Sequence, residues 1–338
     1  MELALWIFLI VLGLALLIKG ADWFVDGAAG IAGKCGISPL VIGLTVVAFG
    51  TSAPELAVSV TSAIRGFTDL AVGNVVGSNI ANILLILGLS ALVRPLIVQK
   101  ESLKLDLPVL LLASVLLVGL GIWGRAVEWW DGIILLAVLA VYVTVLIVKA
   151  LRAQRKPAKH LEPPPQKEEK KEPKSAVGKW FFKMEQKTWF LIVLTIVGLG
   201  MVVGGGTLLV NYTQKLAQHF HVPERIIGLT VVAIGTSLPE LVTSVVAARK
   251  GETDIAVGNI IGSNIFNILL VAGASSLFHP LVFSLEGNLI DSLVALAAAL
   301  LLVFIALVGG KKLGRIGGAV MLACYIGYYV YLFLVPAV

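Results

Sequence analysis

Charged residues and cysteine are both scarce in this chain of 338 residues. Asp, Glu, Lys and Arg make up 14% of it, whereas a soluble globular protein carries about 25%. Hydrophobic residues make up 58%, and this excess extends over the whole chain, so the composition excludes a soluble domain and indicates an integral membrane protein. Two cysteines, Cys35 and Cys324, lie far apart beside apolar segments. They cannot form a disulfide framework or a cysteine-based metal site, and we expect two small buried hydrophobic side chains.

The chain also lacks the features of a cleaved signal peptide. The first apolar segment, LALWIFLIVLGLALLI, is preceded by Glu2 and no basic residue, and no small-x-small cleavage site follows it. We therefore expect it to be the first membrane helix. The net charge of +6 does not indicate nucleic-acid binding, because twelve of the 26 Lys and Arg residues fall between Lys149 and Lys187.

Ten apolar segments reach the length of about 20 residues that a helix needs to cross a bilayer. The predicted spans are 3–20, 38–64, 70–93, 104–123, 131–149, 188–210, 225–248, 255–277, 289–309 and 314–335. With the N-terminus outside, the inside connections hold 22 Lys and Arg residues and the outside connections hold 4. The positive-inside rule then predicts a multi-pass protein of the cell membrane with both termini outside and a cytoplasmic central loop.

The central loop separates two halves. Residues 150–187 are rich in Pro, Lys and Glu and poor in residues that could form a core, so we predict a disordered linker. The predicted fold is all-α, a polytopic membrane protein with one five-helix repeat at 1–149 and a second at 188–338.

A repeat relates these halves. Residues 43–96 and 228–281 align without a gap at a constant offset of 185, and 35 of the 54 positions are identical, including Pro, Glu, Asn, Ser and Asp. Five predicted spans separate the start of one copy from the start of the other. Because five is odd, the copies cross the membrane in opposite directions, which is the inverted-topology repeat typical of transporters with a central site.

The first polar motif of each copy interrupts an apolar run. It reads GTSAPE at residues 50–55 and GTSLPE at residues 235–240. Pro54 is expected to kink or break its helix, and the freed carbonyls near Ala48 and Gly50 must then be buried in protein or face a cavity. Glu55, mirrored by Glu240, costs at least about 2.5 kcal/mol to place at a membrane helix centre, so a functional role is favoured.

The second polar motif reads GSNIAN at residues 77–82 and GSNIFN at residues 262–267. The small residues Gly73, Gly77 and Ser78 are expected to let their helix pack closely against a neighbour. Two hairpins meeting about a pseudo-twofold axis would bring Glu55 and Glu240 together, flanked by Asn82 and Asn267. We predict a diamond of two carboxylates and two amides.

This oxygen-only set suits a hard cation. Ca²⁺ takes about 6–8 oxygens from carboxylates, carbonyls and amides, and two glutamates neutralise one Ca²⁺. Na⁺ fits the same oxygens. Mg²⁺ is disfavoured because it demands a strict octahedron, and Zn²⁺ and copper because sulfur and imidazole are missing.

Several residues have a purely structural alternative. The hydroxyls Thr51, Thr236, Ser78 and Ser263 could bond back to their own helix or join helices. The amides Asn74, Asn259, Asn79 and Asn264 could serve only as interhelical hydrogen bonders. Asp69 and Asp254 follow Thr at predicted helix starts, where capping and the helix dipole would account for them.

At these two motifs the sequence resembles the sodium/calcium exchangers of the cation/calcium antiporter superfamily, particularly the prokaryotic members. The GTS-x-PE and GSNI-x-N pairs match that family's alpha repeats, and the layout of spans and loop matches along essentially the whole chain. The resemblance implies alternating access by two inverted halves, with transported Ca²⁺ and Na⁺, no cofactor and a monomeric transport unit. It implies a site made of Glu55, Glu240, Asn82, Asn267, Thr51, Ser52, Ser78, Thr236, Ser237 and Ser263, with the backbone of Ala48 and Ala233.

One departure from the family pattern is informative. Potassium-dependent members, and some sodium/calcium members, carry Asp where this chain has Asn267. The predicted site therefore has two formal charges rather than three, which argues against K⁺ co-transport and weakens the case for a stoichiometry of three Na⁺. The central loop also lacks the calcium-sensing domains of animal exchangers, and we expect no such regulation.

The favoured function is Na⁺/Ca²⁺ antiport. H⁺/Ca²⁺ antiport through the same carboxylates is the alternative, since two neighbouring buried carboxylates also bind protons. An intramembrane hydrolase using the glutamates as an acid/base pair is disfavoured, because such a pair needs two different environments and the repeat makes them alike. A channel would also select cations with carboxylates, but an inverted repeat favours a transporter. We therefore do not expect an enzyme.

Overall fold

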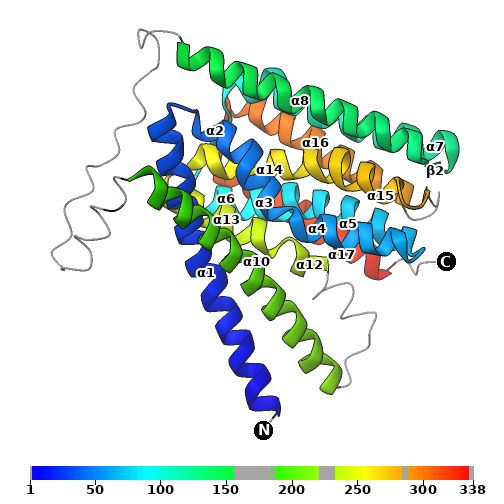
Figure 1. Cartoon of the computed structure of the whole chain (residues 1–338). Coiled ribbons are helices and arrows are strands. Elements are labelled where there is room, and N and C mark those ends of the chain that lie inside the picture. Colours follow the sequence, from blue (N-terminus) through cyan, green and yellow to red (C-terminus); the bar gives the residue numbers. More distant parts are fainter. Residues whose placement is uncertain (1, 156–183, 185–186, 221–232, 284–287, 335–338) are drawn as a thin grey trace.

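The computed structural model describes residues 2–155, 184, 187–220, 233–283 and 288–334 (Figure 1). Eight helices in these ranges are long and apolar enough to cross a membrane, so the predicted all-α polytopic fold is confirmed. They are α1 (Glu2–Cys35), the continuous helix Thr68–Val93 that begins with α5 (Thr68–Ile80), Ser102–Gly124 including α7 (Leu107–Gly124), α8 (Trp129–Arg155), α10 (Thr188–His219), Thr253–Ser276 beginning with α14 (Thr253–Phe266), α16 (Asn288–Val308) and α17 (Arg315–Leu334).

A ninth span is broken in its middle. The segments Pro39–Thr51 and Ala53–Ile64 meet at an angle of 45°, with Ser52 between α3 (Ala48–Thr51) and α4 (Ala53–Ile64). Pro54 lies in the first turn of α4, where a missing backbone N–H costs nothing. The mirrored joint is Ser237, between α12 (Ala233–Thr236) and α13 (Leu238–Lys250). The predicted span 225–248 begins outside the described residues, so the count of ten stays a prediction.

α1, α10 and α8 extend beyond their predicted ends by several residues. α1 continues past residue 20 to Cys35, α10 past 210 to His219, and α8 past 149 to Arg155. In α1 the polar residues do not end the helix, because they are paired: Lys19 lies 3.5 Å from Asp22, and Lys250 of α13 lies 3.0 Å from Asp22 and 2.9 Å from Asp26. The predicted linker 150–187 falls largely outside the described residues.

The two halves run in opposite directions. α1 and α10 lie side by side (Figure 1) and pack through glycines, Gly13 against Gly205 and Gly20 against Gly198. A Cβ added at Gly20 would lie 2.8 Å from the Gly198 carbonyl oxygen, and one at Gly205 would lie 2.7 Å from that of Gly13. As the residue numbers rise along α1, those of the contacting residues in α10 fall, so the two helices are antiparallel. This antiparallel contact between equivalent helices is what an inverted repeat requires.

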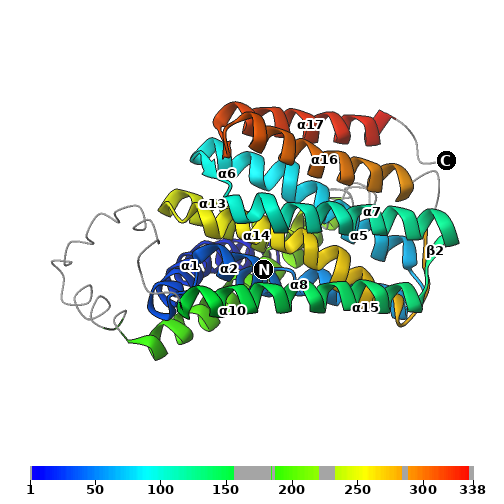
Figure 2. The same ribbon diagram turned by 90° about the horizontal axis from the view of Figure 1, so that it is seen from above.

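Two short β-ribbons connect one half to the other. β1 (Leu96–Ile97) pairs antiparallel with β4 (Lys312–Leu313), and β2 (Ala126–Val127) pairs with β3 (Leu281–Val282). β1 follows the core helix Thr68–Val93 of the first half, and β4 lies between the outer helices α16 and α17 of the second half. In the same way, β3 follows the core helix Thr253–Ser276 of the second half, and β2 lies between the outer helices α7 and α8 of the first half. In Figure 2 the outer helices α16 and α17 lie along one side of the molecule and α8 along the opposite side.

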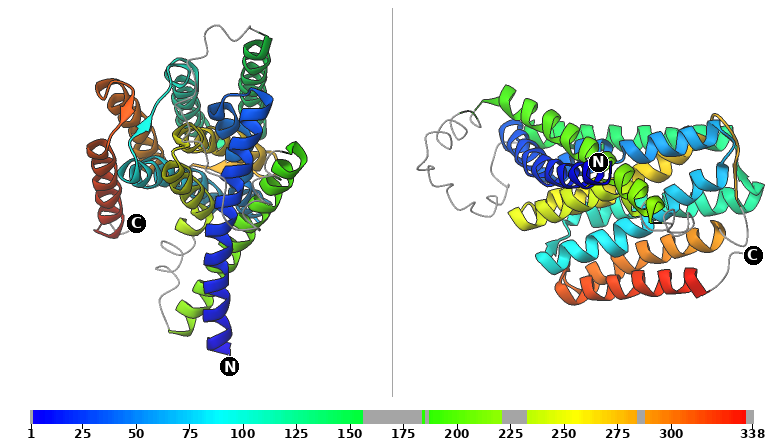
Figure 3. Two further views of the ribbon diagram at one scale, coloured as in Figure 1. Left: turned by 90° about the vertical axis from the view of Figure 1, so that its left-hand side faces the viewer. Right: turned by 90° about the horizontal axis from the view of Figure 1, so that it is seen from below.

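The helices that carry the polar motifs form the centre. In the apolar 18-residue stretch of the helix Thr253–Ser276, 94% is buried inside the molecule. The corresponding share is 78% for the helix Thr68–Val93 and 17% for α1. Figure 3 shows α1 extending away from the bundle towards the N-terminus. Each core hairpin turns at a glycine with positive φ, Gly66 at 80° and Gly251 at 85°, a conformation that glycine adopts without steric cost.

A tyrosine and an aspartate link the outer helices of each half. Tyr142 in α8 donates to Asp106 Oδ1 at 3.0 Å, and Tyr328 in α17 donates to Asp291 Oδ1 at 2.8 Å. Asp106 and Asp291 differ by the repeat offset of 185. The structure therefore extends the repeat beyond the two motifs found in the sequence.

Candidate functional site

Glu55 and Glu240 lie in the first turns of α4 and α13, and both are fully buried. Each carboxylate is bonded by the serine at the joint of the opposite half. Ser52 Oγ donates to Glu240 Oε1 at 3.2 Å, and Ser237 Oγ donates to Glu55 Oε1 at 3.5 Å. The broken helices thus bring the two glutamates to one place at the centre of the molecule.

The joints also direct two helix N-termini at this place. Ser52 and Ser237 precede α4 and α13 but do not cap them with their side chains, because their hydroxyls bond across the site. Carboxylates in the first turn of a helix are stabilised by the helix dipole, typically by about 0.3–1 kcal/mol. This contribution offsets part of the cost of burying Glu55 and Glu240.

Three further hydroxyls lie around the carboxylates. Thr51 donates to Asn259 Oδ1 at 3.1 Å and lies 3.4 Å from Ser263 Oγ, which is 3.4 Å from Glu240 Oε1. Thr236 donates to Asn74 Oδ1 at 3.4 Å. A hydroxyl that gives its proton to an amide oxygen keeps its lone pairs available for a cation.

Asn82 and Asn267 lie at the start of π-helical segments. These segments, Ala81–Leu87 and Asn267–Ala272, continue the core helices that begin at Thr68 and Thr253. Both asparagines are fully buried. π-helical turns are rare and occur frequently at functional sites. No signal in the sequence predicted them.

Five oxygens of the predicted site have no hydrogen-bond partner within the part of the chain that the structure describes. They are Glu55 Oε2, Glu240 Oε2, Asn82 Oδ1, Asn267 Oδ1 and Ser78 Oγ. Leaving a buried polar group unpaired costs about 1–3 kcal/mol, and more for a charged one. These five oxygens therefore form a set of acceptors that a bound cation could satisfy.

The carbonyl of Ala48 is not freed by the break, contrary to the sequence-based expectation. It accepts the backbone N–H of Ser52 at 3.0 Å and lies 3.4 Å from Thr51 Oγ1. The reason is that Pro54 clashes with the carbonyl four residues back, which is that of Gly50. The mirrored residue Ala233 begins α12.

The amides Asn74 and Asn259 act as supports beside the site. Asn74 Nδ2 donates to the Glu55 carbonyl at 3.2 Å and to Ser59 Oγ at 2.8 Å, and Asn259 Nδ2 donates to Ser244 Oγ at 2.8 Å. These bonds join neighbouring helices, as the structural alternative for the two amides predicts. Both copies of the repeat have Asn at this position, and this was the signal for them in the sequence.

The donor set is made of oxygen. Among the described residues, no three His, Cys, Asp or Glu side chains lie close enough together to hold a metal ion. The two glutamates are instead surrounded by hydroxyls and amides, the ligands that Ca²⁺ and Na⁺ accept. Asp69 and Asp254 lie apart from this set: Asp69 accepts from Asn288 at 3.2 Å, and Asp254 from Gln99 at 3.0 Å.

Known proteins resemble this chain along almost its whole length. A family model described as "Sodium/calcium exchanger protein" matches residues 5–148 and 190–334. A putative antiporter, CaxA of Alkalimonas amylolytica, is 39% identical over 96% of this chain and 97% of its own. The sodium/calcium exchanger MaX1 of Methanosarcina acetivorans is 35% identical over 96% of this chain and 97% of its own.

A solved structure has the same fold. The sodium-calcium exchanger NCX_Mj, in crystals soaked with 2.5 mM Na⁺ and 0.1 mM Ca²⁺, superposes with a TM-score of 0.80. Its sequence is 34% identical, and the match covers 97% of this chain and 98% of that one. Sequence and fold thus lead to the same family.

Proposed function

Because the chain belongs to the sodium/calcium exchanger protein family and is a Na⁺/Ca²⁺ antiporter, we propose that both ions bind between the two core hairpins. Glu55 and Glu240 provide the charge, and Asn82 and Asn267 complete the diamond. The remaining ligands are the side chains of Thr51, Ser52, Ser78, Thr236, Ser237 and Ser263 and the backbone carbonyls of Ala48 and Ala233. The Ala48 carbonyl would use its second lone pair, because the first accepts the N–H of Ser52.

The group of unpaired buried oxygens is the observation that carries this proposal. Oε2 of each glutamate and the amide oxygens of Asn82 and Asn267 have no partner within the described residues. A bound cation would satisfy all four at once. The crossed bonds from Ser52 to Glu240 and from Ser237 to Glu55 keep the carboxylates together despite their repulsion.

The charge of the site supports competition between Ca²⁺ and Na⁺. Two glutamates carry two formal negative charges, which one Ca²⁺ neutralises. Asn82 and Asn267 add no charge, so an arriving Na⁺ must share the same carboxylates. The first ion has to leave before the second is fully bound, which couples the two fluxes.

The inverted halves support alternating access. The site lies where the halves meet, and rocking one part against the other would expose it to each side in turn. We further propose outside termini, a cytoplasmic linker at 150–187, a location in the cell membrane and a monomeric transport unit. The relatives are named as exchangers and antiporters, which supports a transporter without an enzymatic step or a resident cofactor.

Flux measurements in proteoliposomes test the proposal. Vesicles loaded with Na⁺ at equal pH on both sides should take up Ca²⁺, and Glu55→Gln and Glu240→Gln should each abolish uptake. Glu101→Gln is the matched control, since Glu101 is exposed and lies outside the site. Uptake that persists in both site variants would contradict the assignment of the site, and uptake driven by a proton gradient without Na⁺ would contradict the coupling ion.

A further inference from the structure

The amide of Asn267 is held in one orientation by a neighbour that is itself oriented. Asn79 Nδ2 donates to the backbone carbonyl of Asn264 at 3.4 Å, and Asn79 Oδ1 accepts from Asn267 Nδ2 at 3.1 Å. A backbone carbonyl can only accept hydrogen bonds, so it requires the nitrogen of Asn79. The oxygen of Asn79 then faces Asn267 and requires its nitrogen. Oδ1 of Asn267 is left without a partner within the described residues.

We propose that Asn79, and by the repeat its mirror Asn264, are positioning residues that make the ligand amides Asn267 and Asn82 present oxygen rather than nitrogen to the cation. The inference rests on the proposed function, since it concerns the same site. The inference goes beyond the proposed function because neither Asn79 nor Asn264 is among the proposed ligands.

The orientation matters because the two ends of an amide have nearly the same shape. Only hydrogen bonds decide which end faces the site. An amide oxygen is a good ligand for Ca²⁺, whereas an NH₂ group directs two hydrogens with partial positive charge at the ion. A ligand amide without an orienting partner would spend part of its time in the wrong orientation.

The mirrored half has equivalent residues but different bonds. Asn264 Nδ2 donates to the Ile260 carbonyl of its own helix at 2.9 Å, which fixes the orientation of Asn264 in the same way. Within the described residues, Asn264 Oδ1 has no partner, and neither atom of the Asn82 amide has one. Asn264 thus has an acceptor free for the nitrogen of Asn82.

The same geometry explains why an amide fits at position 267. An ionised aspartate there would place a carboxylate oxygen against Asn79 Oδ1, so that two acceptors would face each other. Asn79 could donate instead only by turning over, which would break its bond to the Asn264 carbonyl. Asn79 is therefore also a specificity-determining residue, because it favours a site with two formal charges over one with three.

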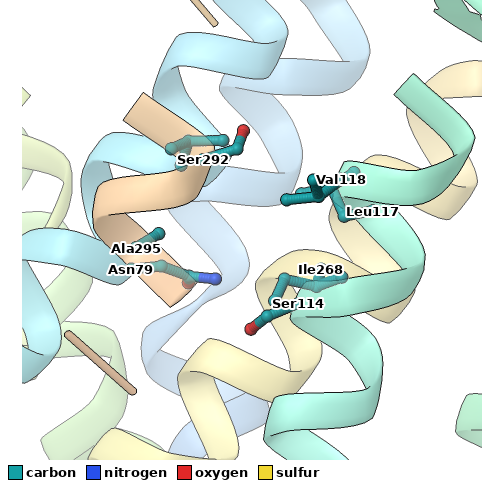
Figure 4. Close-up of a pocket in the computed structure, with 8 residues that line it drawn as sticks. Asn79, Ser114, Leu117, Val118, Ile268, Ser292 and Ala295 are labelled. Atoms are coloured by element: carbon teal, nitrogen blue, oxygen red, sulfur yellow. The ribbon is translucent and has the colours of Figure 1, made fainter. Parts of the chain in front are cut away.

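A small cavity beside Asn79 supplies a matched control. It measures about 10 Å³ and is lined by Asn79 of α5, Ser114 of α7 and Ser292 of α16, among others. Figure 4 shows Asn79 on one side and Ser114 on the other. Ser114 donates to Leu110 of its own helix at 2.9 Å. Ser114→Ala therefore changes the same cavity without touching the bonds between Asn79, Asn264 and Asn267.

Kinetics of Na⁺-driven Ca²⁺ uptake in proteoliposomes test the proposal. Asn79→Ala should raise the KM for Ca²⁺ by about 5- to 160-fold, the range for leaving one buried donor unpaired, with a smaller change in kcat. Ser114→Ala should keep the wild-type KM. A wild-type KM in Asn79→Ala, or equal losses in the two variants, would overturn the proposal.

A double-mutant cycle separates positioning from general packing. If Asn79 acts through Asn267, then adding Asn79→Ala to Asn267→Ala should change KM little, because the amide to be oriented is gone. Additive losses would overturn the proposal. Asn267→Asp provides the opposite test, since Asn79→Ala should improve Ca²⁺ binding in that background rather than weaken it.

Two further arms keep the outcomes distinct. If Asn79→Ala does not fold, Asn264→Ala measured alone and with Asn82→Ala repeats the cycle in the other half. If the wild type exchanges the ions and Glu55→Gln does not, the proposed function stands and the Asn79 result judges the positioning role alone. If Glu55→Gln still exchanges the ions, the assignment of the site is wrong, and the result contradicts the proposed function as well as the positioning role.

Discussion

Among the described residues, the carboxylate of Glu240 accepts hydrogen bonds from Ser52 and Ser263, whereas that of Glu55 accepts one, from Ser237. The two halves differ in the same way at their ligand amides: Asn267 is bonded to Asn79, and Asn82 has no partner within the described residues. A site exposed to one side at a time requires its two halves to be in different conformations. An inverted repeat therefore provides equivalent residues, and the conformation decides which of them are bonded.

Close packing of a core helix against a broken helix is described for α14. Gly258 and Gly262 of α14 lie against the broken helix of the first half, with a Cβ at Gly258 only 2.8 Å from the Leu40 carbonyl oxygen. Their equivalents Gly73 and Gly77 in α5 would meet no described atom within 4 Å. Close packing is thus described at Gly258 and Gly262, and the expectation of close packing at Gly73 and Gly77 stays a prediction. The segment equivalent to Leu40 and Leu44 lies at 225–229, outside the described residues.

The largest difference between the halves should come from adding one methyl group to these glycines. In Gly262→Ala the new Cβ would lie 2.7 Å from that of Ala48 and 2.8 Å from the Leu44 carbonyl oxygen. Such overpacking costs about 1–3 kcal/mol, so thermal unfolding in detergent should occur at a lower temperature. Gly77→Ala is the equivalent change in the other half, and a wild-type unfolding temperature for it would show that α5 and α14 are packed differently. Equal losses would show that α5 and α14 are packed alike.

A smaller difference is expected at the tyrosines of the outer helices. Tyr142→Phe removes the donor to Asp106, which is 2% exposed, whereas Tyr328→Phe removes the donor to the partly buried Asp291. A hydrogen bond to a charged group contributes about 1.5–3 kcal/mol when water cannot replace it. Denaturant unfolding should show a larger loss for Tyr142→Phe. The reverse order would mean that water reaches Asp106 more easily than Asp291.

The smallest effect should come from the ion pairs between α13 and α1. Lys250→Ala removes contacts of 3.0 and 2.9 Å to Asp22 and Asp26, but the lysine side chain is 25% exposed and the aspartates 39% and 32%. Partly exposed pairs contribute about 0–1 kcal/mol, and salt screens them. The loss of stability should shrink as the salt concentration rises. Arg65→Ala, at the equivalent position of the first half, should cause less loss at low salt, and a larger loss there would contradict this view of the two halves.

The fold class and the family were predictable because both depend on features that lie along the chain. Apolar runs of membrane length predicted the spans, and a repeat of 35 identities in 54 positions predicted opposed halves. The ends of helices were less predictable. The first span was predicted to end at residue 20, but α1 continues through Asp22 and Asp26, which pair with Lys250 from far along the chain.

The chemistry of the candidate site was predictable in kind but not in its bonds. The motifs GTSAPE and GSNIAN showed that carboxylates, hydroxyls and amides would gather at the centre. They did not show that Asn79 would orient Asn267, that Ala48 would keep its backbone hydrogen bond, or that π-helical segments would follow the core helices.

By itself the sequence determined that this is an α-helical membrane protein with inverted halves and a central oxygen site, because hydropathy and repetition need no knowledge of contacts. Only the tertiary structure decided which donors and acceptors are paired. Each decisive bond joins residues about 185 positions apart: Ser52 to Glu240, Ser237 to Glu55 and Asn267 to Asn79 are separated by 188, 182 and 188 residues. Such pairs form only when the two halves pack together, and the polar atoms left over by that packing are the ones available to bind an ion.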